Sequence, residues 1–343
     1  MVSTIFITVI LKEVTMKIFD TSSANGVKHP FRVIVGKEIS DHFRSWRFII
    51  LVAIILLTCF GALYTSLSNI EKVIKPTDSA DAFFFLKLFT ASDGTLPSFL
   101  VFISFLGPLL GISLGFDAIN TEQNRGTLSR VLAQPVHRDY LINAKFVAAL
   151  TVISVMFFAL GFLVVGIGLI AIGIPPTPEE FLRIVFFILL SVCYVAFWLN
   201  LAIFFSVQFR QAATSALACI AVWLFFSVFY NMIVNLIAKA IAPPDITYAS
   251  EYRIVAFQNF ILNLMRVAPS QLFNDAATTL LVPNVRSLGP LTMEQVQGAL
   301  PSPLPLGQSL LIVWSQLTAL VAGTVVWFGL SYLSFMRREV RSR

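Results

Sequence analysis

Residues 183–210 read RIVFFILLSVCYVAFWLNLAIFFSVQFR, an apolar run that lies between two arginines. A helix needs about 20 apolar residues to cross roughly 30 Å of hydrocarbon, because it rises about 1.5 Å per residue. The run is too long for a typical strand and lacks period-two alternation. It therefore predicts a transmembrane helix with its charged ends near the membrane surfaces, since a charge at mid-membrane costs at least about 2.5 kcal/mol.

Five more apolar runs of this kind lie elsewhere in the chain, each bounded by Asp, Glu, Lys or Arg. Of the 343 residues, 57% are hydrophobic and 12% are charged, and the mean hydropathy is +0.84, which a soluble domain with a polar surface does not carry. Unpaired backbone cannot face lipid, and a closed barrel would show short alternating segments, so helices fit best. We predict an all-α integral membrane protein with six transmembrane helices, at about residues 48–68, 97–117, 146–173, 184–208, 214–238 and 309–335.

The basic residues predict the orientation of these helices. Of the 24 Lys and Arg residues, 16 fall in the segments on the same side as the N-terminus. An excess of Lys and Arg marks the cytoplasmic side, so both termini are expected there, in a multi-pass protein of the plasma (cytoplasmic) membrane. The net charge of +6 is then a basic inner rim beside anionic lipid, which is a simpler account than binding of nucleic acid.

The segments outside the spans have distinct patterns. We expect residues 1–30 to form a flexible N-terminus, with Met16 as an alternative start to Met1, and residues 31–47 to form an amphipathic helix in the inner membrane interface. The first outer loop, residues 71–93, contains phenylalanines at 83–85 and is expected to rest on the membrane surface. In the outer loop 239–307, apolar stripes predict short helices in the outer leaflet, with a small folded outer domain as the alternative.

The second span contains Gly111-Ile112-Ser113-Leu114-Gly115, which matches the G-x-S-x-G pattern of serine nucleophiles. That pattern needs a strand-to-helix turn and a nearby base, whereas the three histidines all map to the cytoplasmic side. The spacing of Gly107, Gly111 and Gly115 instead favours a helix-packing face that lets a neighbour approach closely. An intramembrane serine protease using Ser113 remains the alternative from another class.

Other chemistry is disfavoured by what the sequence lacks. No G-x-x-x-x-G-K-[ST] is present to hold nucleotide phosphates, and no H-E-x-x-H or C-x-x-C suggests a metal or redox site. Cys59, Cys193 and Cys219 all fall in predicted spans and are interpreted as small buried residues. No charged residue lies well inside a span, which disfavours an ion-coupled carrier. We therefore expect no catalytic residue, no metal and no cofactor bound by this chain.

The inner loop 118–145 is longer than a plain connection between helices requires. After Gly126, three apolar residues form a compact face, flanked by Arg125 and Arg130, and Pro135 ends the pattern. We interpret the segment as a short helix held at the cytoplasmic surface by two spans, able to dock into a groove of another protein.

These residues resemble the type-2 ATP-binding-cassette (ABC) transporter permeases, in particular the branch named for multicopper enzyme maturation. The likeness covers roughly residues 31–343. It rests on Phe116-Asp117-Ala118-Ile119, Glu122, Arg125-Gly126-Thr127-Leu128, Leu132-Ala133-Gln134-Pro135, Arg138 and Lys145, and on Ala268-Pro269-Ser270, Leu272-Phe273 and Leu280-Leu281-Val282-Pro283.

The resemblance implies a half-transporter in which residues 48–343 form the six-helix transmembrane domain. Two such chains would pair as a homodimer or heterodimer, and each would dock on a nucleotide-binding ATPase subunit that carries ATP and Mg. An outer accessory protein is a further possible partner. The resemblance implies that the ATPase-coupling residues are Glu122, Arg125, Gly126, Thr127, Leu128, Arg130, Leu132 and Pro135.

The leading hypothesis is therefore an ATP-driven exporter whose membrane subunit is this chain, moving an unknown substrate across the plasma membrane. Coupling of this kind requires a bistable helix bundle and no catalytic residue in this chain. The alternative within the same architecture is a membrane subunit that transmits force to an outer protein without moving cargo.

Overall fold

The computed structural model describes residues 30–68, 83–92, 96–127, 137–173, 175–241, 251–284, 288 and 303–337. Its described residues are all helical or irregular, and six helices are long and apolar enough to cross a membrane. The prediction of an all-α protein with six candidate spans is confirmed. The segment expected to be a flexible N-terminus lies outside the described residues, apart from Pro30. The candidate spans are Trp46–Ser68 (α3), Phe99–Asn124, Arg138–Ile172 (α9), Pro178–Gln208 (α10), Ala212–Ile241 and Leu306–Arg337 (α16).

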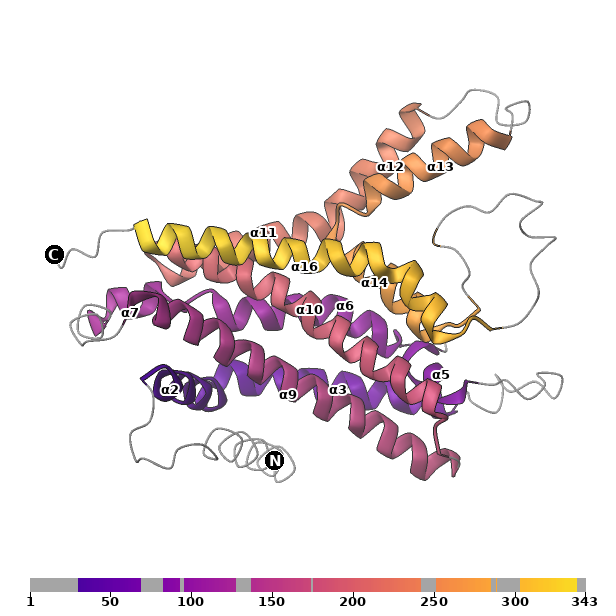
Figure 1. Ribbon diagram of the computed structural model, residues 1–343, viewed down its shortest axis with the longest axis horizontal. Helices are drawn as coiled ribbons and strands as arrows, with labels where there is room; N and C mark the ends of the chain where they lie inside the picture. The colour runs from indigo at the N-terminus through magenta and orange to yellow at the C-terminus, as the bar shows by residue number, and fades with distance from the viewer. Residues whose placement is uncertain are drawn as a thin grey trace.

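Two of the spans are interrupted. The second consists of α6 (Phe99–Gly115), a turn, and the short helix α7 (Asn120–Asn124). The fifth consists of α11 (Ala212–Leu224), one π-helical turn (Phe225–Phe229) and α12 (Tyr230–Ile241). With α13 (Glu251–Met265), α12 forms an arm that leaves the body of the bundle (Figure 1). A hydrogen bond from the Tyr230 hydroxyl to the Leu264 carbonyl, 2.6 Å long, ties the two helices of the arm.

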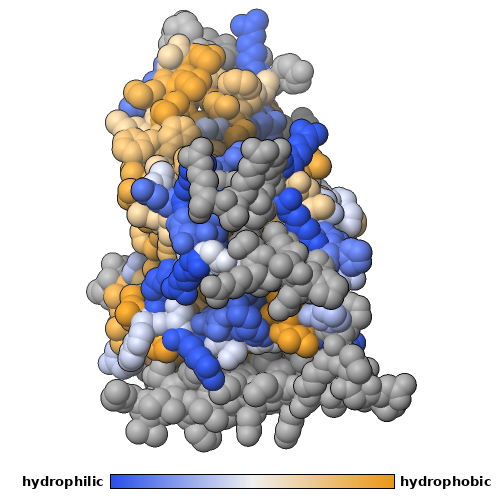
Figure 2. Space-filling model, turned by 90° about the vertical axis from the view of Figure 1, so that its left-hand side faces the viewer, coloured by the Kyte–Doolittle hydropathy of each residue, from blue (hydrophilic) through white to orange (hydrophobic). Residues whose placement is uncertain are grey.

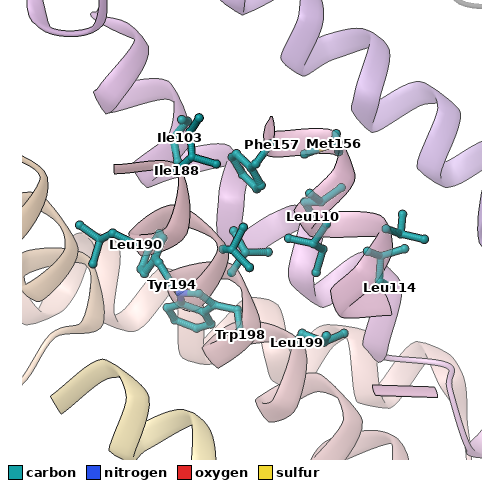
Figure 3. Packing of buried hydrophobic residues seen from close by; sticks show 14 of the residues in the cluster. Ile103, Leu110, Leu114, Met156, Phe157, Ile188, Leu190, Tyr194, Trp198 and Leu199 are labelled. Carbon is teal, nitrogen blue, oxygen red and sulfur yellow. The ribbon is translucent and has the colours of Figure 1, made fainter. Parts of the chain in front are cut away.

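Helix α10 is the centre of the bundle and packs against α6, α9, α14 (Pro269–Leu281) and α16. In the most apolar 18-residue stretch of α10, 72% of the residues are buried, against 17% in the corresponding stretch of the fifth span. Because protein surrounds α10, the helix is apolar on every side. Figure 3 shows Tyr194, Trp198 and Leu199 of α10 beside side chains of α6 and α9. The decisive sequence run therefore forms the core helix.

Close approach of α6 to α10 depends on glycine. A Cβ atom at Gly111 would lie 2.6 Å from the Val195 carbonyl oxygen, and one at Gly115 would lie 2.8 Å from the Ala202 Cβ. At Gly107 the nearest atom, on Val195, would be 3.1 Å away. The three glycines thus lie on the face of α6 that contacts α10, where any larger side chain would push the helices apart.

Helix α5 (Phe84–Thr90), in the loop expected to rest on the membrane surface, is packed into the bundle by two of its phenylalanines. Phe85 and Phe89 are buried, and the Phe89 ring packs edge-on against Phe99 and Phe187. The buried Glu180 accepts a hydrogen bond from the Phe85 backbone nitrogen at 3.1 Å, which anchors the start of α5. Buried aromatic pairs of this kind fix the position of a short helix on its neighbours.

A buried arginine fixes the same end of the bundle, which we call the α5 end. Arg183, fully buried near the start of α10, donates hydrogen bonds to the carbonyls of Leu280 and Leu304 and to the Ser309 hydroxyl. Its guanidinium also pairs with Glu179 at 3.0 Å. Because these partners belong to α14, the segment before α16, and α16 itself, one side chain holds three elements on the central helix.

Candidate functional site

At the opposite end of the bundle, which we call the α7 end, the chain builds a short polar helix. The α6 helix stops at Gly115, and α7 begins at Asn120 after a turn. The Ser206 hydroxyl of α10 accepts hydrogen bonds from the backbone nitrogens of Ile119 (2.9 Å) and Asn120 (3.3 Å). It satisfies amides that a short helix leaves without partners inside the helix. A buried side chain of the central helix therefore caps α7.

The other end of α7 is closed by its own sequence. Gly126 has φ of +67°, a left-handed conformation that glycine adopts without steric cost, and its nitrogen donates to the Gln123 carbonyl at 3.2 Å. The Thr127 hydroxyl donates to the Glu122 carbonyl at 3.2 Å. The Asn124 amide donates to the Arg210 carbonyl at 2.8 Å and so reaches the end of α10. The segment 120–127 is thus a compact one-turn element.

The amphipathic segment predicted at residues 31–47 forms helix α2 (Pro30–Arg44), which ends before Ser45, and Trp46 already belongs to α3. Its buried apolar residues Val35, Ile39 and Phe43 lie on the face packed against α9. The rings of Phe31 and Tyr140 add an edge-on contact between the two helices, with centroids 5.8 Å apart. The apolar side of α2 therefore contacts protein.

Four charged side chains meet where α2, α7 and α9 converge; we call Lys37, Glu38, Glu122 and Lys145 the charge cluster. The Lys145 Nζ lies 2.9 Å from Glu38 Oε2 and 2.9 Å from Glu122 Oε1. The Lys37 Nζ lies 3.0 Å from Glu38 Oε1 and 3.9 Å from Glu122 Oε1. The side chains of Lys145, Glu38 and Glu122 are 7%, 8% and 14% exposed, so the central lysine is neutralised by protein groups, with little help from water.

Titration of the cluster follows from this geometry. Burial alone would raise the pKa of Glu38, but the charges of Lys145 and Lys37 and their hydrogen bonds outweigh it and hold the pKa below its ordinary value of 4.5. Burial acts against the charged form of Lys37 too, yet the carboxylates of Glu38, Glu122 and Asp41 raise its pKa above 10.5. Both α2 residues are therefore charged at neutral pH.

A cavity of about 510 Å³ opens beside the charge cluster. Its walls carry residues of both signs, with an apolar floor that includes Phe48, Leu114 and Ile203. Ser113 and His42 both line it, so the structure brings the serine closer to a histidine than the sequence suggested. No hydrogen bond joins these two described side chains, and Ser113 lies inside the helix α6, without the strand-to-helix turn that a nucleophile of this pattern requires.

Further polar contacts cross-link the α7 end. Arg47 at the start of α3 pairs with Asp117 at 2.7 Å and lies over the Phe116 ring. Arg138 at the start of α9 donates to the Phe335 carbonyl near the end of α16 at 2.7 Å and lies over that ring. Figure 2 shows hydrophilic residues spread over this end of the molecule. Among the described residues, the exposed basic ones at this end include Arg32, Lys37, Arg44, Arg47, Arg125, Arg210 and Arg337.

The structure places the predicted coupling residues unequally. Glu122 points into the charge cluster, Arg125 is exposed at the end of α7, and Gly126 and Thr127 close the turn. The remaining four, Leu128, Arg130, Leu132 and Pro135, lie outside the described residues.

Sequence reasoning missed the partners that hold this element. Glu38 fell within the amphipathic segment 31–47 without being singled out, Lys145 was named only among the residues that carry the family resemblance, and Ser206 was not singled out. The signal available for Lys145 was its place directly before a long run without charges, which is a costly place for a charge without a partner. Nothing in the pattern showed which residues supply that partner.

A family described as ABC-2 family transporter protein matches residues 32–340, a range that takes in nearly all of α2, the six long helices and the charge cluster. A search of curated proteins finds no match.

Proposed function

The chain belongs to the ABC-2 family of transporter membrane proteins, which are non-catalytic permeases that pair with ATPase subunits, and from this premise we propose that its α7 end docks the ATPase. The family assignment also makes it a multi-pass membrane protein. The geometry of the α7 end supports proposals for the place of docking and for the side of the membrane that this end faces.

The observation that carries the proposal is the construction of α7. It is a short polar helix that extends a transmembrane span beyond the apolar core, it is capped by the central helix, and it is tied by charge to α2 and α9. A partner that pushes on such an element moves several helices at once, because all of them are linked to it. The exposed Arg125 at its end offers a contact that is free of the internal cluster.

We propose accordingly that the α7 end faces the cytoplasm. Its exposed basic residues suit the inner membrane surface, where anionic lipids lie. The separate ATPase subunit would bind ATP and Mg, and its closure would press on α7 and shift the helices linked to it, opening a path for cargo toward the other side.

Two copies of the chain are proposed to form the transport unit. The fifth span is the least buried of the six in its most apolar window, which leaves a long apolar face for lipid or for a second copy. The large exposed apolar residues on it include Leu217, Ile220, Leu224, Val228, Met232 and Leu236. A path between two chains would then run beside the α11–α12 span. We also propose that the chain belongs to the multicopper maturation branch of the family, which its sequence resembles. No cargo is assigned from that resemblance.

Charge reversal at Arg125 tests the docking site. The tagged chain is purified with the nucleotide-binding subunit that accompanies it, and the amount retained is compared for Arg125→Glu and for Gln308→Glu, a matched exposed position at the α5 end. We expect retention to fall about tenfold for the first variant and to stay unchanged for the second. Equal retention in both variants would refute docking at α7. In liposomes, an ATPase rate that no transported compound stimulates would favour force transmission over export.

A further inference from the structure

We propose that Lys145 is a positioning residue, which holds α7 in place through its ion pair with Glu122 and so makes α7 and α9 move together. The role of Lys145 in transport rests on the proposed function of α7 as the docking element for the ATPase. The structural part, that the lysine fixes the position of α7, can be tested on the permease alone.

The charge cluster attaches its two acidic members in different ways. Glu38 uses both oxygens, one for Lys145 and one for Lys37, and its helix α2 is also held on α9 by buried apolar residues. Glu122 pairs with Lys145 through Oε1, and its Oε2 has no hydrogen-bond partner among the described residues. Removing the lysine should therefore affect α7 more than α2.

Helix α7 has little else to hold it. Of its five residues only Asn120 is buried, so apolar packing contributes little to its position. Apart from the Lys145 pair, its ties among the described residues are the Ser206 cap at its start, the Asn124 bond to Arg210 at its end, and a longer pair of Glu122 with Lys37 at 3.9 Å. The first two lead to α10 and the third to α2, whereas Lys145 is the described tie to α9.

Burial makes the Lys145–Glu122 pair costly to break, because either residue alone would leave a buried charge without a partner. A lysine that is 7% exposed cannot exchange its protein partners for water without first leaving the interface. Lys145 lies two turns from the start of α9, a helix of 35 residues that runs the length of the bundle (Figure 1). A shift of α7 is thus transmitted to α9 through the Glu122–Lys145 contact. It is transmitted further to α2 through the contact of Lys145 with Glu38.

The first experiment measures the mobility of α7 without any partner protein. A spin label is placed at Arg125→Cys in a background with Cys59, Cys193 and Cys219 replaced by alanine, and its spectrum is recorded in nanodiscs. We expect Lys145→Gln and Glu122→Gln to shorten the rotational correlation time of the label severalfold. The matched variant Glu38→Gln removes the other carboxylate that pairs with Lys145 and should leave the rotational correlation time of the label unchanged.

The rescue variant separates charge pairing from a general loss of folding. Lys145→Arg keeps the positive charge beside both carboxylates and should keep the label restricted, while Lys145→Gln does not. Size-exclusion profiles and melting temperatures confirm which variants are folded. A label that stays restricted in folded Lys145→Gln, or one that is released in folded Lys145→Arg, overturns the proposal.

The second experiment separates this proposal from that of ATPase docking. With the co-purified ATPase, the ratio of the ATPase rate of the complex to that of the isolated ATPase should fall about five- to tenfold in Lys145→Gln and be kept in Lys145→Arg. If the label is released but this ratio is unchanged, Lys145 positions α7 and the coupling role proposed for α7 is wrong. If the label is unaffected while Arg125→Glu still abolishes ATPase retention, docking stands and the role of Lys145 is refuted.

Discussion

The Ser206 hydroxyl lies 2.9 Å from the backbone nitrogen of Ile119, so a residue of the central helix α10 caps a helix that begins 86 to 87 positions earlier in the chain. The serine is fully buried, and its second partner is the nitrogen of Asn120. The cap connects the most buried span of the bundle to the helix that we propose as the docking element for the ATPase.

Replacing this serine should release the start of α7. In Ser206→Ala two buried backbone amides lose their acceptor, at a cost of about 1–3 kcal/mol for each unsatisfied group. Hydrogen–deuterium exchange of the amides at 119 and 120 should rise strongly, while exchange in the middle of α10 should not change. Protection that remains as in the wild type would show that the cap does not stabilise α7.

The glycine face of α6 should tolerate no added methyl group. In Gly111→Ala the new Cβ would be 2.6 Å from the Val195 oxygen and 3.0 Å from the Leu199 nitrogen, both backbone atoms that cannot move aside alone. We expect a loss of about 1–3 kcal/mol in stability from overpacking, seen as a lower melting temperature in detergent. Gly166→Ala is the control, since nothing lies within 4 Å of its added Cβ and alanine favours helix. Equal melting temperatures for the two variants would contradict close packing of α6 on α10.

The buried Arg183 should be essential for the α5 end. Arg183→Met leaves the carbonyls of Leu280 and Leu304 without their donor, and we expect a loss of about 2–5 kcal/mol. Ser309→Ala removes one of the same hydrogen bonds and keeps the arginine, so its loss should be about 1 kcal/mol. Chemical denaturation of the purified protein ranks the two variants. The reverse order would show that the serine, not the arginine, organises the contact.

The charge cluster predicts a pH dependence. Because the folded pKa of Glu38 is held below 4.5, its ion pairs contribute their full stability above about pH 4.5, and the contribution is lost as the pH falls through the lower folded value. At pH 7 we expect Glu38→Gln to be less stable than the wild type by about 1.5–3 kcal/mol. The difference in melting temperature between the two proteins should shrink as the pH is lowered below 4.5. A difference independent of pH would show that the carboxylate is not ionised in the folded protein.

The sequence alone predicted those features of the fold that depend on the residues of a single helix. Six apolar runs bounded by charges determine six helices, since lipid leaves few other structures for them. Arg183 and Arg210, which bound the quoted run, lie in the structure near the two ends of α10. The amphipathic pattern at residues 31–47 likewise predicted a helix, which the structure places at Pro30–Arg44.

The parts that depend on which helices meet could not be predicted. The two partners of Lys145, Glu122 and Glu38, lie more than 20 and more than 100 positions before it in the chain, and no periodicity indicates them. Burial of α5 was missed for the same reason, because Phe85 and Phe89 look alike whether they face lipid or protein. Glu122 was chosen from a motif, and only the structure shows that its carboxylate is committed to an internal pair.

The central claim is that the α7 end of the bundle lies in the compartment of the ATPase. A membrane-impermeant maleimide applied to intact cells, with single cysteines at Arg125→Cys or Gln308→Cys in the cysteine-free background, tests it most directly. We predict labelling of position 308 in intact cells and of position 125 only after the membrane is opened. Labelling of position 125 from outside, with position 308 protected, would contradict the account.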